Sequence, residues 1–335
     1  MAKYNHCEPS IMKVIYIVSP SSPNVPHSVI RRERAINFLK TQGYKIIRGK
    51  LLDKTIGHTT GTISERVTEL NDAFKSNAQI IYASFGGENS SSLLDKIDYA
   101  ELTINPKIII GNSDITAILL AIYAKIKLPT WHFMTLLPAF GEFEPMLSQN
   151  YNNFNQIIMS QNADIEYFKP TVYTNDYINW NQHERPKKVF QNQWIGLNDG
   201  VASGVLLGGN LKTIVKLLGS EYLPSFKKVI LVLEDSVSSP EIVESCIASL
   251  ANSGAISSII GLIICKCENY LDQSRDYGDD IYQFFKNYDV PIFKNFDSAH
   301  TYPCLPIKIG GVYFMSVKNN DIRLILKNKG YIINK

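Results

Sequence analysis

The chain has 335 residues, enough for about two domains of roughly 150 residues each. Its 34 lysines and arginines nearly balance 31 aspartates and glutamates, leaving a formal charge of +3, which argues against a nucleic-acid partner. Hydrophobic residues make up 45% and charged residues 19%, as in ordinary globular proteins, and no apolar run is long enough to cross a membrane.

The N-terminus contains no long apolar stretch followed by a small-residue cleavage site, so we predict no secretory signal and a cytoplasmic location. Five cysteines are scattered without a Cys-x-x-Cys pair, and six histidines form no His-Glu-x-x-His arrangement. We therefore expect neither a disulfide framework nor a metal site, and no cofactor.

The first half of the chain predicts alternating strands and helices. Strands are expected at residues 14–19, 44–48, 79–85 and 107–110, and helices at residues 28–42, 64–76, 90–97 and 114–126. Because the strands are apolar on both faces, the pattern predicts an α/β fold with a parallel sheet covered by helices on both sides. This is a flavodoxin- or Rossmann-like domain over residues 1–150.

The chain changes character from about residue 149 to 199, where Asn, Gln, Tyr and Trp are dense and periodicity is weak. We expect a linker with an insertion over residues 151–199 and a second α/β domain over residues 200–335. In that domain the glycine-rich stretch 204–210 is expected to open a helix through residue 218. The other expected elements are strands at 229–234 and 259–266, helices at 239–252 and 279–286, and a terminal hairpin of 312–317 and 322–326.

A serine follows a predicted strand in the sequence Ile-Ile-Ile-Gly-Asn-Ser-Asp-Ile-Thr, which ends at Thr116. Ser113 would lie at the carboxyl edge of the sheet, at the start of a helix whose dipole lies beneath it, and this position suits a nucleophile. An isolated serine there is more often only a helix cap. The second glycine of Gly-x-Ser-x-Gly is also missing, which argues against an ordinary α/β-hydrolase.

Paired glycines, Gly86 and Gly87, follow another predicted strand. Glycine lets the backbone approach a ligand closely and direct N–H groups toward it, as an oxyanion hole requires. The stretch matches no phosphate-binding loop motif, and a bare pair of glycines is alternatively only a turn.

Two further residues could complete a catalytic set with Ser113. Glu234 follows an apolar strand, so its carboxylate should be partly desolvated and need a partner, unless it caps the next helix. His300 lies in a proline-bounded loop, where a lone histidine is usually structural. Together the three residues supply a nucleophile, a base and a group that orients the base.

Several motifs together resemble the LD-carboxypeptidase family of serine peptidases over about residues 13–325. They are Phe85-Gly86-Gly87, Gly111-Asn112-Ser113-Asp114, Leu207-Gly208-Gly209-Asn210-Leu211, Leu233-Glu234-Asp235 and His300-Thr301-Tyr302-Pro303. The resemblance implies that Ser113 is the nucleophile, His300 the general base and Glu234 the residue that orients His300. It also implies an oxyanion hole from the backbone N–H groups of Gly87 and Asp114, a swivelling, partly barrel-like C-terminal domain, and a homodimer.

Within this family the chain is more similar to the microcin C immunity branch, which cuts peptidyl-nucleotide antibiotics, than to the murein tetrapeptide carboxypeptidases. The reason is the aromatic-bearing segment between the domains. Trp180 in that segment is predicted to stack on a nucleobase, unless its aromatic residues pack the domain interface. Glu268 is expected where an acid contacts the substrate. Asn112 and Ala299 depart from the aromatic residue and the glycine usual in the family motifs.

The predicted function is hydrolysis of an amide bond in a peptidyl-nucleotide or related aminoacyl-adenylate, for self-immunity or detoxification. One alternative is a murein tetrapeptide LD-carboxypeptidase. The other is a non-catalytic module that binds a nucleotide or a peptide in the same cleft.

Overall fold

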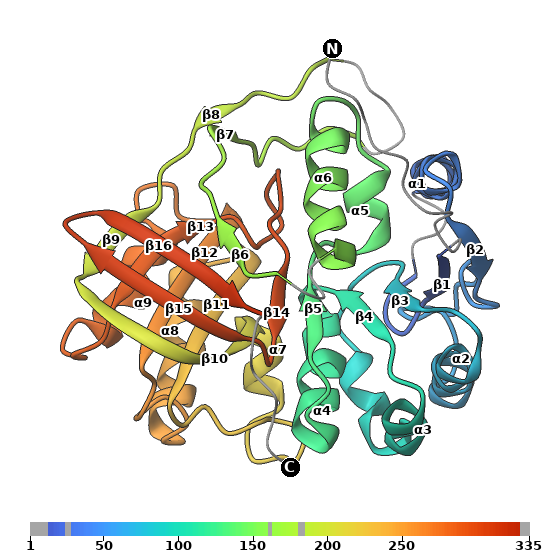
Figure 1. Ribbon diagram of the computed structural model, residues 1–335, viewed down its shortest axis with the longest axis horizontal. Helices are drawn as coiled ribbons and strands as arrows, with labels where there is room; N and C mark the ends of the chain where they lie inside the picture. The colour runs from blue at the N-terminus through green and yellow to red at the C-terminus, as the bar shows by residue number, and fades with distance from the viewer. Residues whose placement is uncertain (1–12, 24–27, 160–162, 180–184, 329–335) are drawn as a thin grey trace.

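The computed structural model describes residues 13–23, 28–159, 163–179 and 185–328, in which two larger sheets lie side by side (Figure 1). The N-terminal sheet has the strand order β14-β5-β4-β3-β1-β2. All of these strands run parallel except β14, which is antiparallel to β5. The strands are β1 (Val14–Val18), β2 (Lys45–Arg48), β3 (Ile80–Ala83), β4 (Ile108–Gly111), β5 (Thr130–His132) and β14 (Ile307–Ile309).

Helices cover this sheet in two groups, as the strands with two apolar faces predict (Figure 1). One group is α1 (Val29–Thr41), α5 (Leu136–Phe140) and α6 (Met146–Met159). The other is α2 (Ile63–Lys75), α3 (Tyr99–Ile104) and α4 (Thr116–Ile126), with the 3₁₀ helices η1 (Ser90–Lys96) and η2 (Ser113–Ile115). A capping box of Thr62 and Glu65 begins α2. The predicted parallel α/β arrangement is confirmed.

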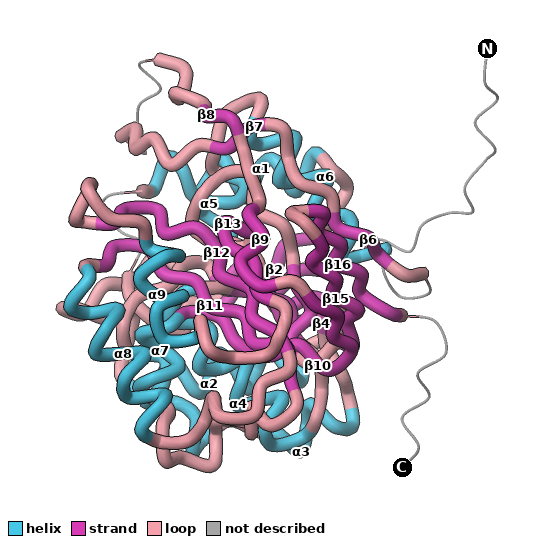
Figure 2. The backbone as a smooth tube through the Cα atoms, turned by 90° about the vertical axis from the view of Figure 1, so that its left-hand side faces the viewer, coloured by secondary structure: helices cyan, strands magenta, loops and turns pink. Residues whose placement is uncertain are grey.

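The second sheet has the order β6-β16-β15-β10-β11-β12-β13-β9, with β10 to β13 parallel. Its strands are β6 (Ile165–Tyr167), β9 (Ile195–Asn198), β10 (Gly200–Asn210), β11 (Val229–Ser238), β12 (Gly261–Tyr270), β13 (Ile292–Phe296), β15 (Val312–Lys318) and β16 (Asp321–Lys327). Helices α7 (Leu211–Lys216), α8 (Pro240–Asn252) and α9 (Tyr277–Phe285) lie together beside it (Figure 2). The predicted terminal hairpin is confirmed as β15 and β16, with Asn319 and Asn320 at positive φ in its turn.

The predicted helix at residues 204–210 is wrong, because this stretch belongs to strand β10 and the helix begins only at Leu211. Gly208 and Gly209 have φ angles of 140° and 134°. A Cβ on Gly208 would lie 1.9 Å from the carbonyl oxygen of Val232 in the neighbouring strand. The glycines therefore allow two strands to approach closely, and they do not mark a helix start.

The expectation of weak structure from residue 149 is wrong as far as Met159, because α6 continues to that residue. The helix buries Phe154 and Ile157, and the Phe154 ring packs against Phe140 and Tyr82. A short hairpin, β7 (Val172–Tyr173) with β8 (Phe190–Gln191), follows within the predicted insertion.

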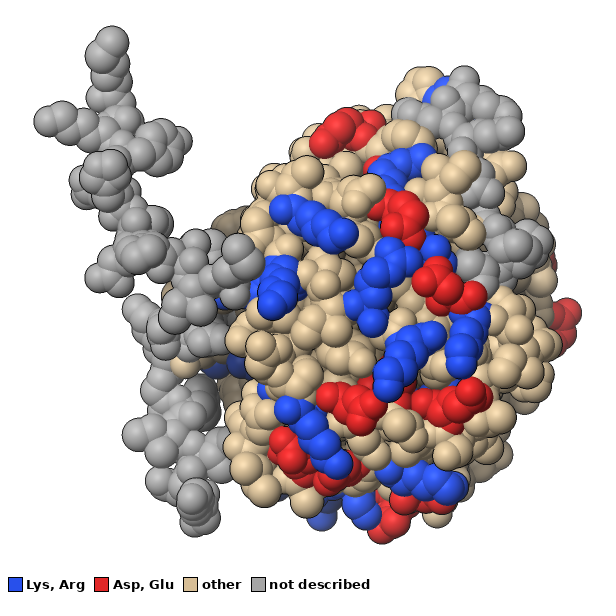
Figure 3. Space-filling model, turned by 90° about the vertical axis from the view of Figure 1, so that its right-hand side faces the viewer, with Lys and Arg blue, Asp and Glu red and all other residues tan. Residues whose placement is uncertain are grey.

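Lysines and arginines are interspersed with acidic residues over the face shown in Figure 3, as the balanced composition predicts. Exposed ion pairs join Arg48 to Glu33 and Lys54 to Glu65. In the described ranges, no helix combines the length and the apolar character that a bilayer span requires.

Candidate active site

Four of the residues predicted from the sequence line one cavity of about 280 Å³: Gly87, Ser113, Glu268 and His300. Gly87 follows β3, Ser113 follows β4, Glu268 lies near the end of β12, and His300 follows β13. The carboxyl ends of parallel strands are the usual place for a ligand site in open α/β sheets. The predicted Asp114 and Glu234 are buried just behind the cavity wall, and Trp180 lies outside the described residues.

Ser113 lies in a tight turn between β4 and the 3₁₀ helix η2. Its φ angle is 59°, in the left-handed region that costs a non-glycine residue about 1–2 kcal/mol. The turn packs closely against Gly86, where a Cβ would lie 3.0 Å from the Ser113 Cβ and 3.1 Å from its Oγ, so a larger residue would press on Ser113. Such a turn presents a side chain outward at the edge of the sheet, as a nucleophile requires.

The side chain of Asp114 fixes this turn from behind. Its Oδ2 accepts hydrogen bonds from the Ser21 hydroxyl at 2.5 Å and from the Ser90 backbone N–H at 2.7 Å. The Ser90 hydroxyl in turn donates to the Asp114 carbonyl at 2.6 Å. The carboxylate therefore has a structural role, and only the backbone of Asp114 is available to a ligand.

Gly87 must be glycine for two reasons. Its φ angle is 145°, and a Cβ there would lie 2.1 Å from the Ser22 Oγ. Within the described part of the chain no hydrogen bond occupies the backbone N–H of Gly87 or of Asp114. Both groups are thus available as the N–H donors that the family resemblance implies, and their role as an oxyanion hole stays a prediction.

Glu234 and His300 form a hydrogen bond, 2.9 Å from Nδ1 of His300 to Oε2 of Glu234, and Glu234 is fully buried. Burial lowers the pKa of the His300 imidazole, but the Glu234 carboxylate, helped by Glu268 and Asp235, raises this pKa to about 9. Burial raises the pKa of the Glu234 carboxyl, but His300 and His132 hold it below its ordinary range. The pair therefore favours a charged carboxylate beside a strongly basic imidazole.

The loop that carries His300 is anchored at its start by Asp297. This buried carboxylate accepts hydrogen bonds from Lys266 Nζ at 2.5 Å, from Trp194 Nε1 at 2.7 Å and from the Asn192 amide. Trp194 also packs against Phe296, so this aromatic residue of the insertion has a structural role.

The same loop is anchored at its far end by Tyr302. Its backbone N–H and carbonyl exchange hydrogen bonds with Thr174 at 2.9 and 2.8 Å, and its hydroxyl accepts from Arg31 at 2.9 Å. Strand β14 then joins the N-terminal sheet, so both sheets fix the position of His300.

Lys187 is a cavity residue that the sequence analysis missed. Its Nζ lies 2.9 Å from Oε2 of Glu142 and 4.1 Å from the centre of the Tyr302 ring, and burial lowers its pKa. Glu268, also in the cavity, has its pKa raised by burial, against the effects of His300, Lys187 and Arg31. The insertion carries several lysines, and nothing in the local sequence distinguishes this one.

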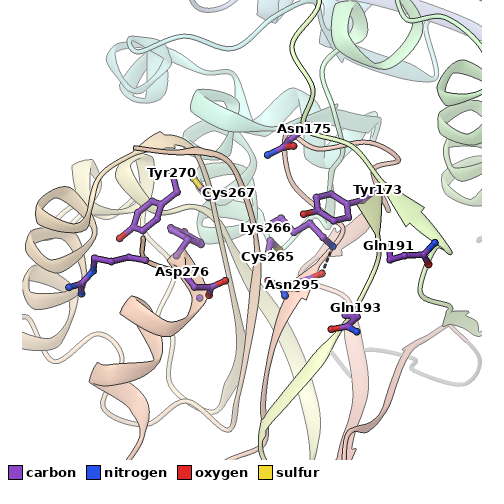
Figure 4. A pocket seen from close by; sticks show the side chains of 13 residues that line it. Tyr173, Asn175, Gln191, Gln193, Cys265, Lys266, Cys267, Tyr270, Asp276 and Asn295 are labelled. Atoms are coloured by element: carbon purple, nitrogen blue, oxygen red, sulfur yellow. Dashed lines mark hydrogen bonds between the residues drawn. The ribbon is translucent and has the colours of Figure 1, made fainter. Parts of the chain in front are cut away.

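A second cavity of about 310 Å³ lies beside the first, between the β7–β8 hairpin and the end of β12 (Figure 4). Lys266 lies within it and donates to the Asn295 carbonyl (Figure 4). Asn175 is part of the wall between the two cavities, because it lines the second and donates to the carbonyl of Glu268 at 3.0 Å. The charged groups Lys266 and Asp276 are already paired with Asp297 and Lys294.

His132 is the other residue that the sequence analysis missed. It is completely buried, and its Nε2 lies 3.5 Å from Oε1 of Glu234. The sequence Thr-Trp-His at residues 130–132 forms only a three-residue strand, too short for a periodicity signal. A search for polar residues at strand ends could have found it.

Comparisons with known proteins identify the family of the chain. Residues 15–133 match the LD-carboxypeptidase N-terminal domain, and residues 203–313 match the LD-carboxypeptidase C-terminal domain. A putative carboxypeptidase of Vibrio cholerae serotype O1 is 36% identical, with 94% of this chain and 96% of that protein covered. The microcin C7 self-immunity protein MccF of Escherichia coli is 33% identical, with 91% of each chain covered.

A solved structure of MccF in complex with glutamyl sulfamoyl guanosine has the same fold. It superposes with a TM-score of 0.90 at 31% identity and covers 95% of this chain and 96% of that chain. The domain matches and the identity to full-length relatives show that the chain belongs to the LD-carboxypeptidase family of serine peptidases.

Proposed function

We propose that the protein is a serine hydrolase that cleaves an amide bond in a peptidyl-nucleotide or aminoacyl-adenylate compound, and that it thereby detoxifies such compounds. The observation that carries the proposal is one cavity lined by Ser113, Gly87 and His300, with Nδ1 of His300 bonded to the buried Glu234. A module that only binds a ligand has no need for a serine, a basic histidine and a buried acid in this order.

In this proposal the Ser113 hydroxyl attacks the amide carbonyl and His300 takes its proton at Nε2. Glu234 holds the Nδ1–H tautomer and stabilises the imidazolium that forms. The N–H groups of Gly87 and Asp114 stabilise the oxyanion of the tetrahedral intermediate. His300 then donates its proton to the leaving amine, and water hydrolyses the acyl-enzyme by the same route.

The proposed substrate class rests on two kinds of support. MccF has been solved in complexes with glutamyl sulfamoyl guanosine and with aspartyl sulfamoyl adenosine, which are aminoacyl-nucleotide analogues. In this chain, Glu268 places an acid in the cavity, where a carboxylate can pair with the ammonium group of an aminoacyl substrate. We keep Trp180 as the proposed stacking partner of the base.

The proposal includes the organisation of the chain. We infer a domain of residues 1–150 that supplies Ser113 and a domain of residues 200–335 that supplies Glu234 and His300, with the insertion of residues 151–199 between them. We further propose a homodimer, on the basis of family resemblance.

A direct comparison of substrates tests this function. The protein is offered aspartyl sulfamoyl adenosine and a murein tetrapeptide in parallel, and the products are identified by mass spectrometry. We expect release of aspartate from the first and no release of D-alanine from the second. Cleavage of the tetrapeptide alone would instead assign the protein to cell-wall trimming, and cleavage of neither would favour a binding module.

The pH dependence of hydrolysis gives a second test, because the base must be neutral to accept a proton. With the pKa of His300 raised to about 9, kcat/KM should rise with pH up to that region, and not level off just above pH 6.5. Below this pKa the imidazole is protonated and activity falls tenfold per pH unit.

The matched control for the pH profile is Glu268→Gln. This substitution removes one carboxylate that raises the pKa of His300, so the acidic limb should move to lower pH even if KM also changes. A profile that is flat down to pH 5 in both proteins would contradict the role of His300.

A further inference from the structure

His132 is a buried histidine that the proposed mechanism does not use. It is the last residue of β5, and its ring lies between two buried residues of the C-terminal half. Nε2 is 3.5 Å from Oε1 of Glu234, and Nδ1 is 3.3 Å from Oγ of Ser298. A side chain from the N-terminal sheet thus contacts the acid that bonds His300.

The strand register places His132 among the catalytic segments. It pairs with Gly111, two residues before Ser113, and with Ile307 in the strand that follows the His300 loop. Gly209 lies beside the ring, since a Cβ at that position would make an ordinary contact, 3.4 Å, with Cδ2 of His132. His132 therefore contacts Glu234 directly and lies beside the segments that lead to Ser113 and follow His300.

The hydrogen-bond requirements of these atoms assign the protons. Oε2 of Glu234 already accepts from His300, whereas Oε1 and the facing Nε2 of His132, 3.5 Å apart, have no hydrogen-bond partner in the described part of the chain. Leaving both atoms unpaired in a buried site is unfavourable. A proton on Nε2 of His132 would serve both atoms, and Nδ1 would still bond the Ser298 hydroxyl, which can donate or accept.

We propose that His132 is a positioning residue that directs an Nε2–H at Oε1 of Glu234 and so holds the carboxylate in the orientation that receives Nδ1–H of His300. The inference rests on the proposed function. The contact of 3.5 Å is longer than an ordinary N–H···O bond, so the proposal requires it to shorten when substrate binds, as catalytic hydrogen bonds often do. Glu234 is then positioned from both sheets: its own strand, β11, belongs to the second sheet, and His132 of β5 belongs to the N-terminal sheet.

The test compares two substitutions of this one residue. His132→Phe keeps an aromatic ring but removes the N–H donor, and we expect kcat to fall about ten- to a hundredfold, the loss typical of removing an outer-shell partner of a metal ligand. KM should stay unchanged, because His132 does not line the cavity. His132→Gln retains an N–H donor at a similar reach and should recover most of the rate.

The pKa of His300, measured by NMR without substrate, gives a readout that a packing role would not change. Loss of the donor makes Glu234 more basic, so Glu234 holds the His300 proton more tightly and the pKa of His300 should rise in His132→Phe and return in His132→Gln. The other titratable groups that act on Glu234 or His300 are the same in all variants: Asp235, Glu268, Cys265, Cys304 and Tyr277.

Trp131→Phe is the matched control, since Trp131 precedes His132 in β5 and its ring faces Lys308. It should lose stability without shifting the pKa of His300. If His132→Phe does not fold, Ser298→Ala is used in its place. Without the Ser298 hydroxyl at Nδ1, the proton of His132 is no longer fixed on Nε2, so the pKa of His300 should shift in the same direction.

An unshifted pKa of His300 in His132→Phe, or equal losses of kcat in His132→Phe and His132→Gln, would overturn the positioning role. Failure of the wild-type protein to cleave either substrate would instead overturn the proposed function. The NMR titration would still show whether His132 controls the Glu234–His300 pair.

Discussion

Ser113→Ala is expected to abolish hydrolysis, with kcat reduced on the order of 10⁶-fold, as when a triad serine is removed. His300 and the N–H groups of Gly87 and Asp114 would remain, but no atom would be left to form the acyl-enzyme. Steady-state hydrolysis of aspartyl sulfamoyl adenosine measures the loss.

The fold should tolerate this substitution. Serine and alanine carry the same Cβ, so the strain of the 59° φ angle is the same in both proteins, and stability should change by less than about 0.5 kcal/mol. The variant should still bind the substrate analogue in calorimetry. Ser236→Ala, a serine of the same cavity, is the matched control and should keep most of the activity. Wild-type turnover by Ser113→Ala would exclude Ser113 as the nucleophile.

Glu234→Gln is expected to lower kcat by about 10⁴-fold, as the corresponding amide substitution does in a Ser-His-Asp triad. The amide has the size of the carboxylate but no charge. It cannot hold the Nδ1–H tautomer of His300, and it does not stabilise the imidazolium that forms in the reaction. Because this carboxylate raises the pKa of His300, the substitution should also move the acidic limb of the remaining activity to lower pH.

Asp235→Asn is the control for Glu234→Gln, because it removes a charge from the next buried residue. The Asp235 carboxylate contacts Lys212 at 3.1 Å and Asn210 at 3.3 Å, and neither of these residues lines the cavity. We expect less than a tenfold change in kcat for Asp235→Asn. A similar loss in both variants would mean that the charge of this region, and not the His300 contact, supports activity.

Local signals in the sequence were sufficient for much of the fold. Hydrophobic period, glycines after strands and helix caps act over a few residues, and they predicted β1, β3, β4 and the terminal hairpin. They also singled out Ser113, Gly87 and Glu234, because each follows or ends a predicted strand, and strand ends meet at one edge of a parallel sheet. His300 was singled out as a histidine in a proline-bounded loop that could complete a catalytic set with Ser113 and Glu234.

Other features depend on contacts between distant segments. The segment of residues 204–210 is a strand because Gly208 approaches Val232, and β14 joins the N-terminal sheet only because the His300 loop returns to β5. No local pattern encodes either contact. The raised pKa of His300 has the same origin, since it depends on Glu234, 66 residues earlier in the chain.

The sequence by itself therefore determined the α/β class, the family resemblance and the residues capable of hydrolytic chemistry, since these depend on residue type and short-range order. Only the tertiary structure decided how these residues are held: the buried Glu234, the anchored His300 loop and the contact from His132. The physical reason is that burial and hydrogen-bond geometry, which set the pKa and the orientation of a catalytic group, arise from segments far apart in the chain.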